Sequence, residues 1–265
     1  MATIAQFVHY IEKLMTLSRK SLKQTHTPQA ISERLAAGPS QVYLKDMVYG
    51  AIDGAITTFA IVSGVAGAGL GVGVIIIMGL ANLLADGFSM AVSNYLGTRA
   101  ENQRCETMRQ HEYQEIELYP EGEREEVRQI YAMKGFTGKE LDDLVTLVTS
   151  NKELWVNTML QEEHGIGLDD TNPLLAGVVT FVAFLIAGSL PLVSFVVNWV
   201  APNTIGSPYI FSSVVTLLAF FVVGLLKGKY VNQRWYVSGF ETVAIGAVAA
   251  SLAFAVGYFL NDLVV

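Results

Sequence analysis

The feature that most constrains this chain is an uncharged stretch, because residues 174–226 contain no Asp, Glu, Lys or Arg. A helix needs about 20 apolar residues to cross about 30 Å of hydrocarbon, and this stretch is much longer. Its apolar residues are continuous rather than alternating, which favours membrane helices over barrel strands. Charged residues make up only 15% of the chain, against about 25% in soluble proteins. The sequence therefore predicts an integral, all-α membrane protein.

Five segments are apolar enough to be membrane spans. They are residues 47–69, 72–98, 173–200, 208–226 and 237–260. Very few residues separate the first two spans, which are therefore predicted to form an antiparallel hairpin. Gly50 and Gly54 in the first span allow a neighbouring helix to approach closely in lipid. Pro191 is expected to kink the third span.

A polar segment, residues 99–170, is predicted to form a three-helix insert between spans two and three. The first of its helices continues span two, the second covers about 121–133, and the third begins near Thr137. Thr137 and Glu140 make a capping-box pattern, in which each side chain accepts a hydrogen bond from a free backbone N–H. Gly165 is expected to end the third helix.

The remaining segment is the N-terminal region, in which apolar residues recur at helical spacing from Ile4 to Met15. Such an amphipathic helix either packs on the insert or lies on anionic lipid headgroups. The predicted organisation has four parts: the amphipathic region, the membrane hairpin, the insert and the last three spans. They cover residues 1–45, 46–98, 99–170 and 171–265.

The distribution of basic residues predicts the orientation. All 17 Lys and Arg lie in the N-terminal region, in the insert or in the turn between spans four and five. With five spans, these places share one side of the membrane, which the positive-inside rule makes the cytosol. The N-terminus and the insert are thus predicted to be cytosolic and the C-terminus outside. The net charge of −7 argues against nucleic-acid binding.

Carboxylates recur at helical spacing in the insert and, with one thioether, form a candidate metal site. They are Glu112 with Glu115, Glu123 with Glu126, and Met159 with Glu163. Converging carboxylates suit divalent cations, and a thioether adds affinity for a softer metal such as Fe²⁺. The alternative is a solvated acidic face neutralised by Arg124 and Arg128, which spacing alone favours. Cys105, His111 and His164 are candidate accessory ligands.

Two acids lie inside predicted spans, Asp53 in the first and Asp86 in the second, with Met90 one turn further on. Acids in a membrane are costly and usually mark a path for ions or protons. The alternative is a structural role, with Asn82, Asn94 or a buried hydroxyl as the partner.

A hydrolase is the competing class. A serine protease needs a His within reach of its nucleophile, whereas all four His of this chain lie outside the predicted spans. An intramembrane aspartyl hydrolase that uses Asp53 and Asp86 stays open on these grounds.

From about Lys45 to its C-terminus, the chain resembles the vacuolar iron transporter family. The resemblance rests on three motifs: Gly50-Ala51-Ile52-Asp53-Gly54, Ser89-Met90-Ala91, and the six insert residues Glu112, Glu115, Glu123, Glu126, Met159 and Glu163. It implies a five-span homodimer with a cytosolic three-helix metal-binding domain, and export of Fe²⁺ or Mn²⁺ from the cytosol in exchange for protons. It further implies that Asp53 and Met90 line the translocation path and that the six insert residues gather metal ions.

The chain departs from the family pattern at two places. Members often carry Gly-Glu where Ser93-Asn94 stands here, and we hypothesise that Asp86 compensates for the missing acid. A Glu that often follows the Met of the third helix is Leu160 here. The expected transport path is therefore Asp53, Met90, Asp86 and Asn94.

The expected function is a proton-coupled exporter of Fe²⁺, with Mn²⁺ as a second candidate ion, and not an enzyme. It would need no permanent cofactor. The source is expected to be a prokaryote and the location a cell or inner membrane. The alternatives are a membrane-anchored metal sensor or store and the aspartyl hydrolase.

Overall fold

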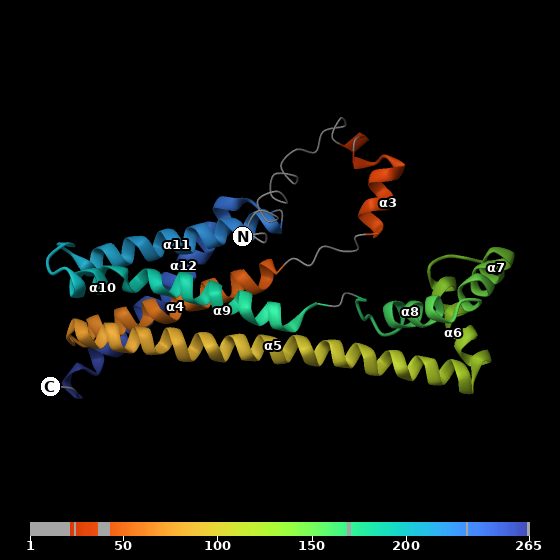
Figure 1. Ribbon diagram of the computed structural model, residues 1–265, viewed down its shortest axis with the longest axis horizontal. Helices are drawn as coiled ribbons and strands as arrows, with labels where there is room; N and C mark the ends of the chain where they lie inside the picture. The colour runs from red at the N-terminus through yellow and green to blue at the C-terminus, as the bar shows by residue number, and fades with distance from the viewer. Residues whose placement is uncertain (1–21, 24, 37–42, 169–170, 232, 264–265) are drawn as a thin grey trace. The chain divides into compact units, whose positions relative to one another are not determined.

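The computed structural model describes residues 22–23, 25–36, 43–168, 171–231 and 233–263, which form helices and no strand (Figure 1). The predicted amphipathic stretch from Ile4 to Met15 lies outside these residues. Helix α3, Pro28–Ala36, belongs to the same N-terminal region and buries none of its residues.

Five helical segments of the described chain are long and apolar enough to cross a membrane, which confirms the predicted fold class. They are α4 (Leu44–Gly67), α5 (Val72–Leu118), α9 to α10 (Pro173–Val200), α11 (Pro208–Tyr230) and α12 (Trp235–Phe259). The third is interrupted as predicted at Pro191. A 3₁₀ turn, Leu190–Leu192, separates α9 (Pro173–Ser189) from α10 (Val193–Val200), because proline supplies no backbone N–H for an α-helical hydrogen bond.

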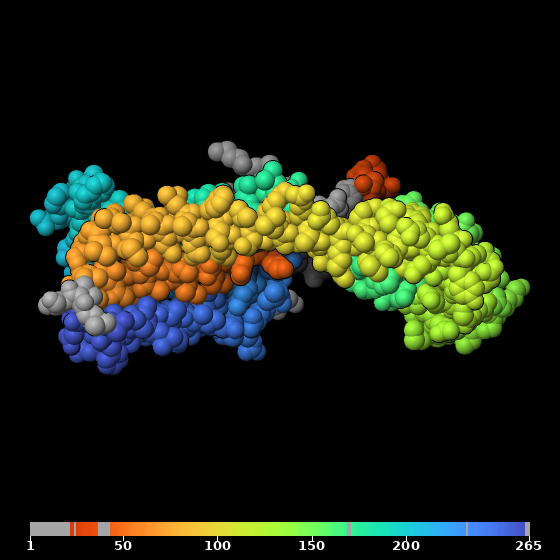
Figure 2. Space-filling model, turned by 90° about the horizontal axis from the view of Figure 1, so that it is seen from below, coloured from red at the N-terminus to blue at the C-terminus, as the bar shows by residue number. Residues whose placement is uncertain are grey.

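The chain divides into two compact units. The first unit combines the residues up to Val92 with those from Gly177 onward, and the second unit is Ser93–Ala176. The first unit is an apolar bundle in which α4 lies between the first part of α5 and α12 (Figure 2). Its core includes Phe59, Phe184, Phe195 and Phe220. The boundaries of the two units do not define membrane borders, so the predicted borders near residues 98 and 171 stay predictions.

Glycines let the helices of the bundle approach one another closely. A Cβ on Gly50 or Gly54 would collide with the backbone of Thr180 or Phe184 on α9. Close approach gains dispersion contacts, which drive helix association where lipid is as apolar as the side chains. The segment around Asp53 is therefore packed tightly against a second helix, as its flanking glycines predict.

The second unit combines the polar end of α5 with three short helices, α6 (Pro120–Met133), α7 (Gly138–Thr149) and α8 (Lys152–Glu162). Their apolar faces enclose a core that includes Val127, Val156 and Leu160, none of which is exposed.

The prediction of a single third helix from Thr137 onward is wrong, because the helix breaks between α7 and α8. The Asn151 side chain accepts hydrogen bonds from the N–H groups of Glu153 and Leu154 at 3.0 and 3.1 Å, and so starts a new helix. The predicted capping box is also absent, because Thr137 makes no side-chain capping hydrogen bond.

Candidate metal site

The end of α8 positions the side chains at the centre of the candidate site. The N–H groups of Glu163 and His164 both donate to the Met159 carbonyl oxygen, at 3.0 and 3.3 Å. Gly165 then adopts a left-handed φ of +63°, so that the Ile166 N–H returns to the Leu160 carbonyl at 2.8 Å. This helix ending is typical for glycine, and it holds Glu163 and His164 beside α5.

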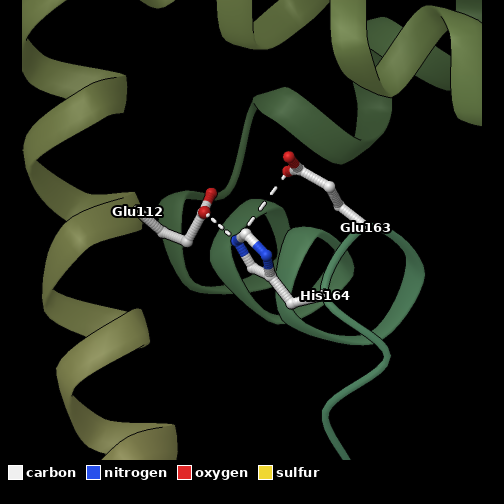
Figure 3. A group of neighbouring side chains, drawn as sticks. All are labelled: Glu112, Glu163 and His164. Carbon is white, nitrogen blue, oxygen red and sulfur yellow. Dashed lines mark hydrogen bonds and ion pairs between the residues drawn. The ribbon is translucent and has the colours of Figure 1, made fainter.

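Glu112 on α5 meets these two residues (Figure 3). One carboxylate oxygen, Glu112 Oε1, lies 2.7 Å from His164 Nε2, and Glu163 Oε2 lies 3.9 Å from the same nitrogen. One ligand atom from each of the three residues lies within 4.8 Å of the other two. Two carboxylates and an imidazole at this spacing suit a divalent transition metal.

Two acids of the cluster are buried and incompletely paired. Glu112 is only 1% exposed and Glu123 on α6 only 7%. The second carboxylate oxygen of each, Oε2, has no hydrogen-bond partner among the described residues. A buried acceptor without a partner is costly, and in a native structure it points to an ion or water at that place.

The electrostatics place all five predicted glutamates in one cluster. Burial, followed by the charges of Glu126, Glu112, Glu115 and Glu163, raises the pKa of Glu123 to about 7. Burial, followed by the charges of Glu163, Glu112 and Glu115, also raises the pKa of Glu126. Burial alone would lower the pKa of His164, but its hydrogen bond to Glu112 and the nearby carboxylates raise it overall. Mutual repulsion of this kind is relieved when a cation binds.

The two arginines proposed as counter-charges contact other groups. Arg128 pairs with Asp142 at 2.5 Å and with Glu125 at 3.7 Å. The Arg124 guanidinium lies 5.8 Å from the centre of the Trp155 ring. Among the described residues no Lys or Arg forms an ion pair with any of the five clustered glutamates, so the neutralised acidic face does not describe this cluster.

The Met159 thioether, the predicted sulfur ligand, lies in an apolar environment. Met159 is completely buried in the apolar core of the second unit, as is Leu160. The role predicted for Met159 stays a prediction.

His164 is the residue that sequence reasoning undervalued. Its signal was its position directly after Glu163 and before the glycine that ends the helix. Spacing along one helix face identifies pairs within a helix, whereas His164 lies beyond the end of α8.

The acids in the membrane bundle are half-buried, and the charge of Asp86 is close enough to repel that of Asp53. The predicted structural partner Asn82 instead donates to the Thr57 hydroxyl at 3.1 Å. Met90 packs against the core of the bundle. In the second unit, Asn94 donates to the Ala176 carbonyl at 3.3 Å.

These features define a polytopic helical membrane protein with an acidic polar unit in which Glu112, Glu163 and His164 converge. Residues 44–258 match the VIT family, and the chain belongs to that family. It is 36% identical to the vacuolar iron transporter of Toxoplasma gondii, over 84% of this chain and 76% of the relative. It is 28% identical to vacuolar iron transporter 1 of Arabidopsis thaliana, over 92% and 95% of the two chains, and 27% identical to that of Eucalyptus grandis, over 80% and 84%.

Membership of the family bears on two of the expectations, the hydrolase alternative and the prokaryotic source. Its named members are transporters, so the protein is a transporter rather than an enzyme, and the aspartyl hydrolase is rejected. These relatives come from eukaryotes, so they lend no support to the expected prokaryotic source.

Proposed function

We propose that the protein exports Fe²⁺, and also Mn²⁺, from the cytosol in exchange for protons, as a homodimer in a cell or inner membrane. The observation that carries the proposal is the glutamate cluster. Its members are mutually repelling, two are buried with unpaired oxygens, and no Lys or Arg among the described residues pairs with them. Relatives over most of the chain are named as iron transporters.

In the first proposed step, the cluster captures the ion at the cytosolic face. Its proposed members are Glu112, Glu115, Glu123, Glu126, Met159 and Glu163. The orientation is supported by the basic residues, all of which lie on the side predicted to be cytosolic.

In the second step, Asp53 and Met90 coordinate the partly dehydrated ion within the bundle. Carboxylate and thioether together suit Fe²⁺ better than a purely hard cation. Asp86, which lies close enough to repel Asp53, supplies the second acid of the path. Asn94 continues the path beyond Met90. Protonation of Asp53, or of an acid coupled to it, from the acidic side then releases the ion.

The test is metal uptake into liposomes that contain the full-length protein with its insert outward, with and without an acidic interior. Uptake of Fe²⁺ and Mn²⁺ should require the pH gradient and should fall to background in Asp53→Ala. Asp262→Ala removes an exposed acid near the C-terminus and should transport normally. Normal flux through Asp53→Ala would refute the mechanism. Metal that binds but never crosses, with correct insertion verified, would favour the sensor or store.

A further inference from the structure

We propose that His164 is a metal ligand of the glutamate cluster, and that its imidazole biases the cluster towards Fe²⁺, Co²⁺ and Zn²⁺ and against Mn²⁺ and Mg²⁺. The inference rests on the proposed capture of metal by the cluster. It adds a nitrogen donor to a set that otherwise offers carboxylates and one thioether.

The geometry of the imidazole is the first reason. His164 Nε2 points at the carboxylates of Glu112 and Glu163, at 2.7 and 3.9 Å (Figure 3). Ligand atoms that share one ion at about 2.1 Å lie about 3 to 4 Å from one another. The distance to Glu163 already falls in that range, and the distance to Glu112 needs to lengthen by less than about 1 Å.

The buried oxygen of Glu112 is the second reason, and it is independent of the first. Glu112 is 1% exposed, and its Oε1 contacts His164 while its Oε2 has no partner among the described residues. A histidine that served only to satisfy Glu112 would leave this second oxygen unexplained. A cation between Glu112, Glu163 and His164 would give the carboxylate a partner that matches its charge.

Access is the third reason. The His164 side chain is 23% exposed and that of Glu163 is 42% exposed, so solvent reaches one side of the group while Glu112 closes the other. An ion can therefore arrive from water and exchange part of its hydration shell for protein ligands.

The chemistry of imidazole sets the selectivity. A site made only of carboxylates suits Mg²⁺, Ca²⁺ and Mn²⁺, whereas imidazole suits Zn²⁺, Cu²⁺, Fe²⁺ and Ni²⁺. The affinity of a site rises from Mn²⁺ through Fe²⁺ and Co²⁺ to Cu²⁺, and an imidazole ligand makes this rise steeper. Ligation by Nε2 requires the ring proton to be on Nδ1. His164 would thus give the cluster a stronger preference for Fe²⁺ over Mn²⁺ than carboxylates alone provide.

The competing explanation is that His164 is only a hydrogen-bond partner of Glu112. His164→Gln separates the two, because an amide still donates a hydrogen bond but coordinates through oxygen. His111→Gln is the matched control, since His111 is an exposed histidine one residue before Glu112 that joins no metal-binding group among the described residues.

The experiment uses the full-length protein in detergent and measures Zn²⁺, Co²⁺ and Mn²⁺ affinities by competition titration. His164→Gln should weaken Zn²⁺ and Co²⁺ binding by about 10-fold or more, and Mn²⁺ binding by less than about 3-fold. Pulsed EPR of bound Cu²⁺ should show imidazole nitrogen in the wild type and in His111→Gln, and lose it in His164→Gln. Thermal unfolding of the metal-free variants checks their fold.

Each outcome decides the matter. Metal binding with an unchanged ratio of Zn²⁺ to Mn²⁺ affinity in His164→Gln would overturn the ligand role and leave the proposed transport function standing. Persistence of the nitrogen signal in that variant would do the same. A wild-type protein that binds none of these metals would overturn the capture step itself, and the role of His164 with it.

Discussion

The two compact units of this protein differ in the kind of buried side-chain group that has no hydrogen-bond partner among the described residues. In the membrane bundle these are the hydroxyls of Thr58 and Ser238, whereas in the second unit they include two carboxylates. In the membrane bundle, the Thr57, Thr216 and Thr242 hydroxyls donate to carbonyl oxygens one turn earlier in their own helices, at 2.7–2.9 Å. In the second unit, Glu112 and Glu123 are buried with one carboxylate oxygen each unpaired. A bundle in lipid gains by closing most of its polar groups on itself, whereas a cluster that binds cations must keep charged ligand atoms free.

The difference extends to packing. The bundle depends on glycines that bring helix backbones together, while the second unit encloses a small core of large side chains beneath a charged surface. Steric changes should therefore damage the bundle most, and charge changes should act on metal binding in the second unit.

The largest effect is expected from Gly54→Leu, because a Cβ there already lies 2.5 Å from the Phe184 carbonyl oxygen. Forcing α4 and α9 apart should cost about 3 kcal/mol or more and lower the thermal stability of the purified protein sharply. Gly73→Leu is the matched control, because nothing lies within 4 Å of a Cβ at that position of α5. Equal stability of the two variants would contradict the close packing.

A smaller effect, confined to metal binding, is expected from removing charge in the cluster. Glu112→Gln combined with Glu115→Gln should weaken metal binding by about 100-fold, since a divalent ion loses two charged ligands. The melting temperature without metal should not fall, because the change relieves repulsion. The control pair, Glu101→Gln with Glu125→Gln, removes two exposed acids that pair with arginines outside the cluster. Unchanged affinity in the first pair, measured by titration calorimetry, would discredit the cluster.

The spans, the hairpin and the proline break could be predicted from sequence because each follows from local composition. The spacing of Glu112 from Glu115 and of Glu123 from Glu126 predicted helix faces, but not that the first member of each pair is buried and the second exposed. That distinction depends on how α5, α6 and α8 pack. The break before Asn151 was missed because the apolar pattern continues through it, although an asparagine cap is a local signal. The meeting of His164 with Glu112 could not be predicted either, because it depends on how the end of α8 packs against α5.

The third prediction concerns pH and follows from the pKa of Glu123, which is raised to about 7. A metal must displace the proton that this carboxyl holds below that pH, so metal affinity should fall by up to about tenfold per pH unit below 7. Titrations between pH 5.5 and 8 would measure this, with Glu123→Gln as the variant in which the dependence should become shallower. A flat profile in the wild type would contradict the raised pKa.

The same pKa predicts the stability of the metal-free protein. The folded state holds the Glu123 proton up to about pH 7, whereas the unfolded chain releases it near its ordinary value of 4.5. The folded state therefore binds more protons in this window, and stability should decline as the pH rises through it. Added metal should reverse the decline, because it binds the deprotonated folded form. Unfolding followed at several pH values, with and without Mn²⁺, would show both effects.

The smallest effect is expected from Arg128→Ala, which removes an arginine close to the cluster in sequence but paired with Asp142 and Glu125. These partners are solvent-exposed, so the pairs should contribute less than about 1 kcal/mol to stability. Metal affinity should stay within about 2-fold of the wild type at physiological salt, where charges that are not in contact are strongly screened. A metal affinity that rose tenfold would mean that Arg128 competes with the cation for the cluster. The second unit would then be a neutralised acidic surface, and the contrast with the bundle, whose unpaired buried groups are hydroxyls, would fail.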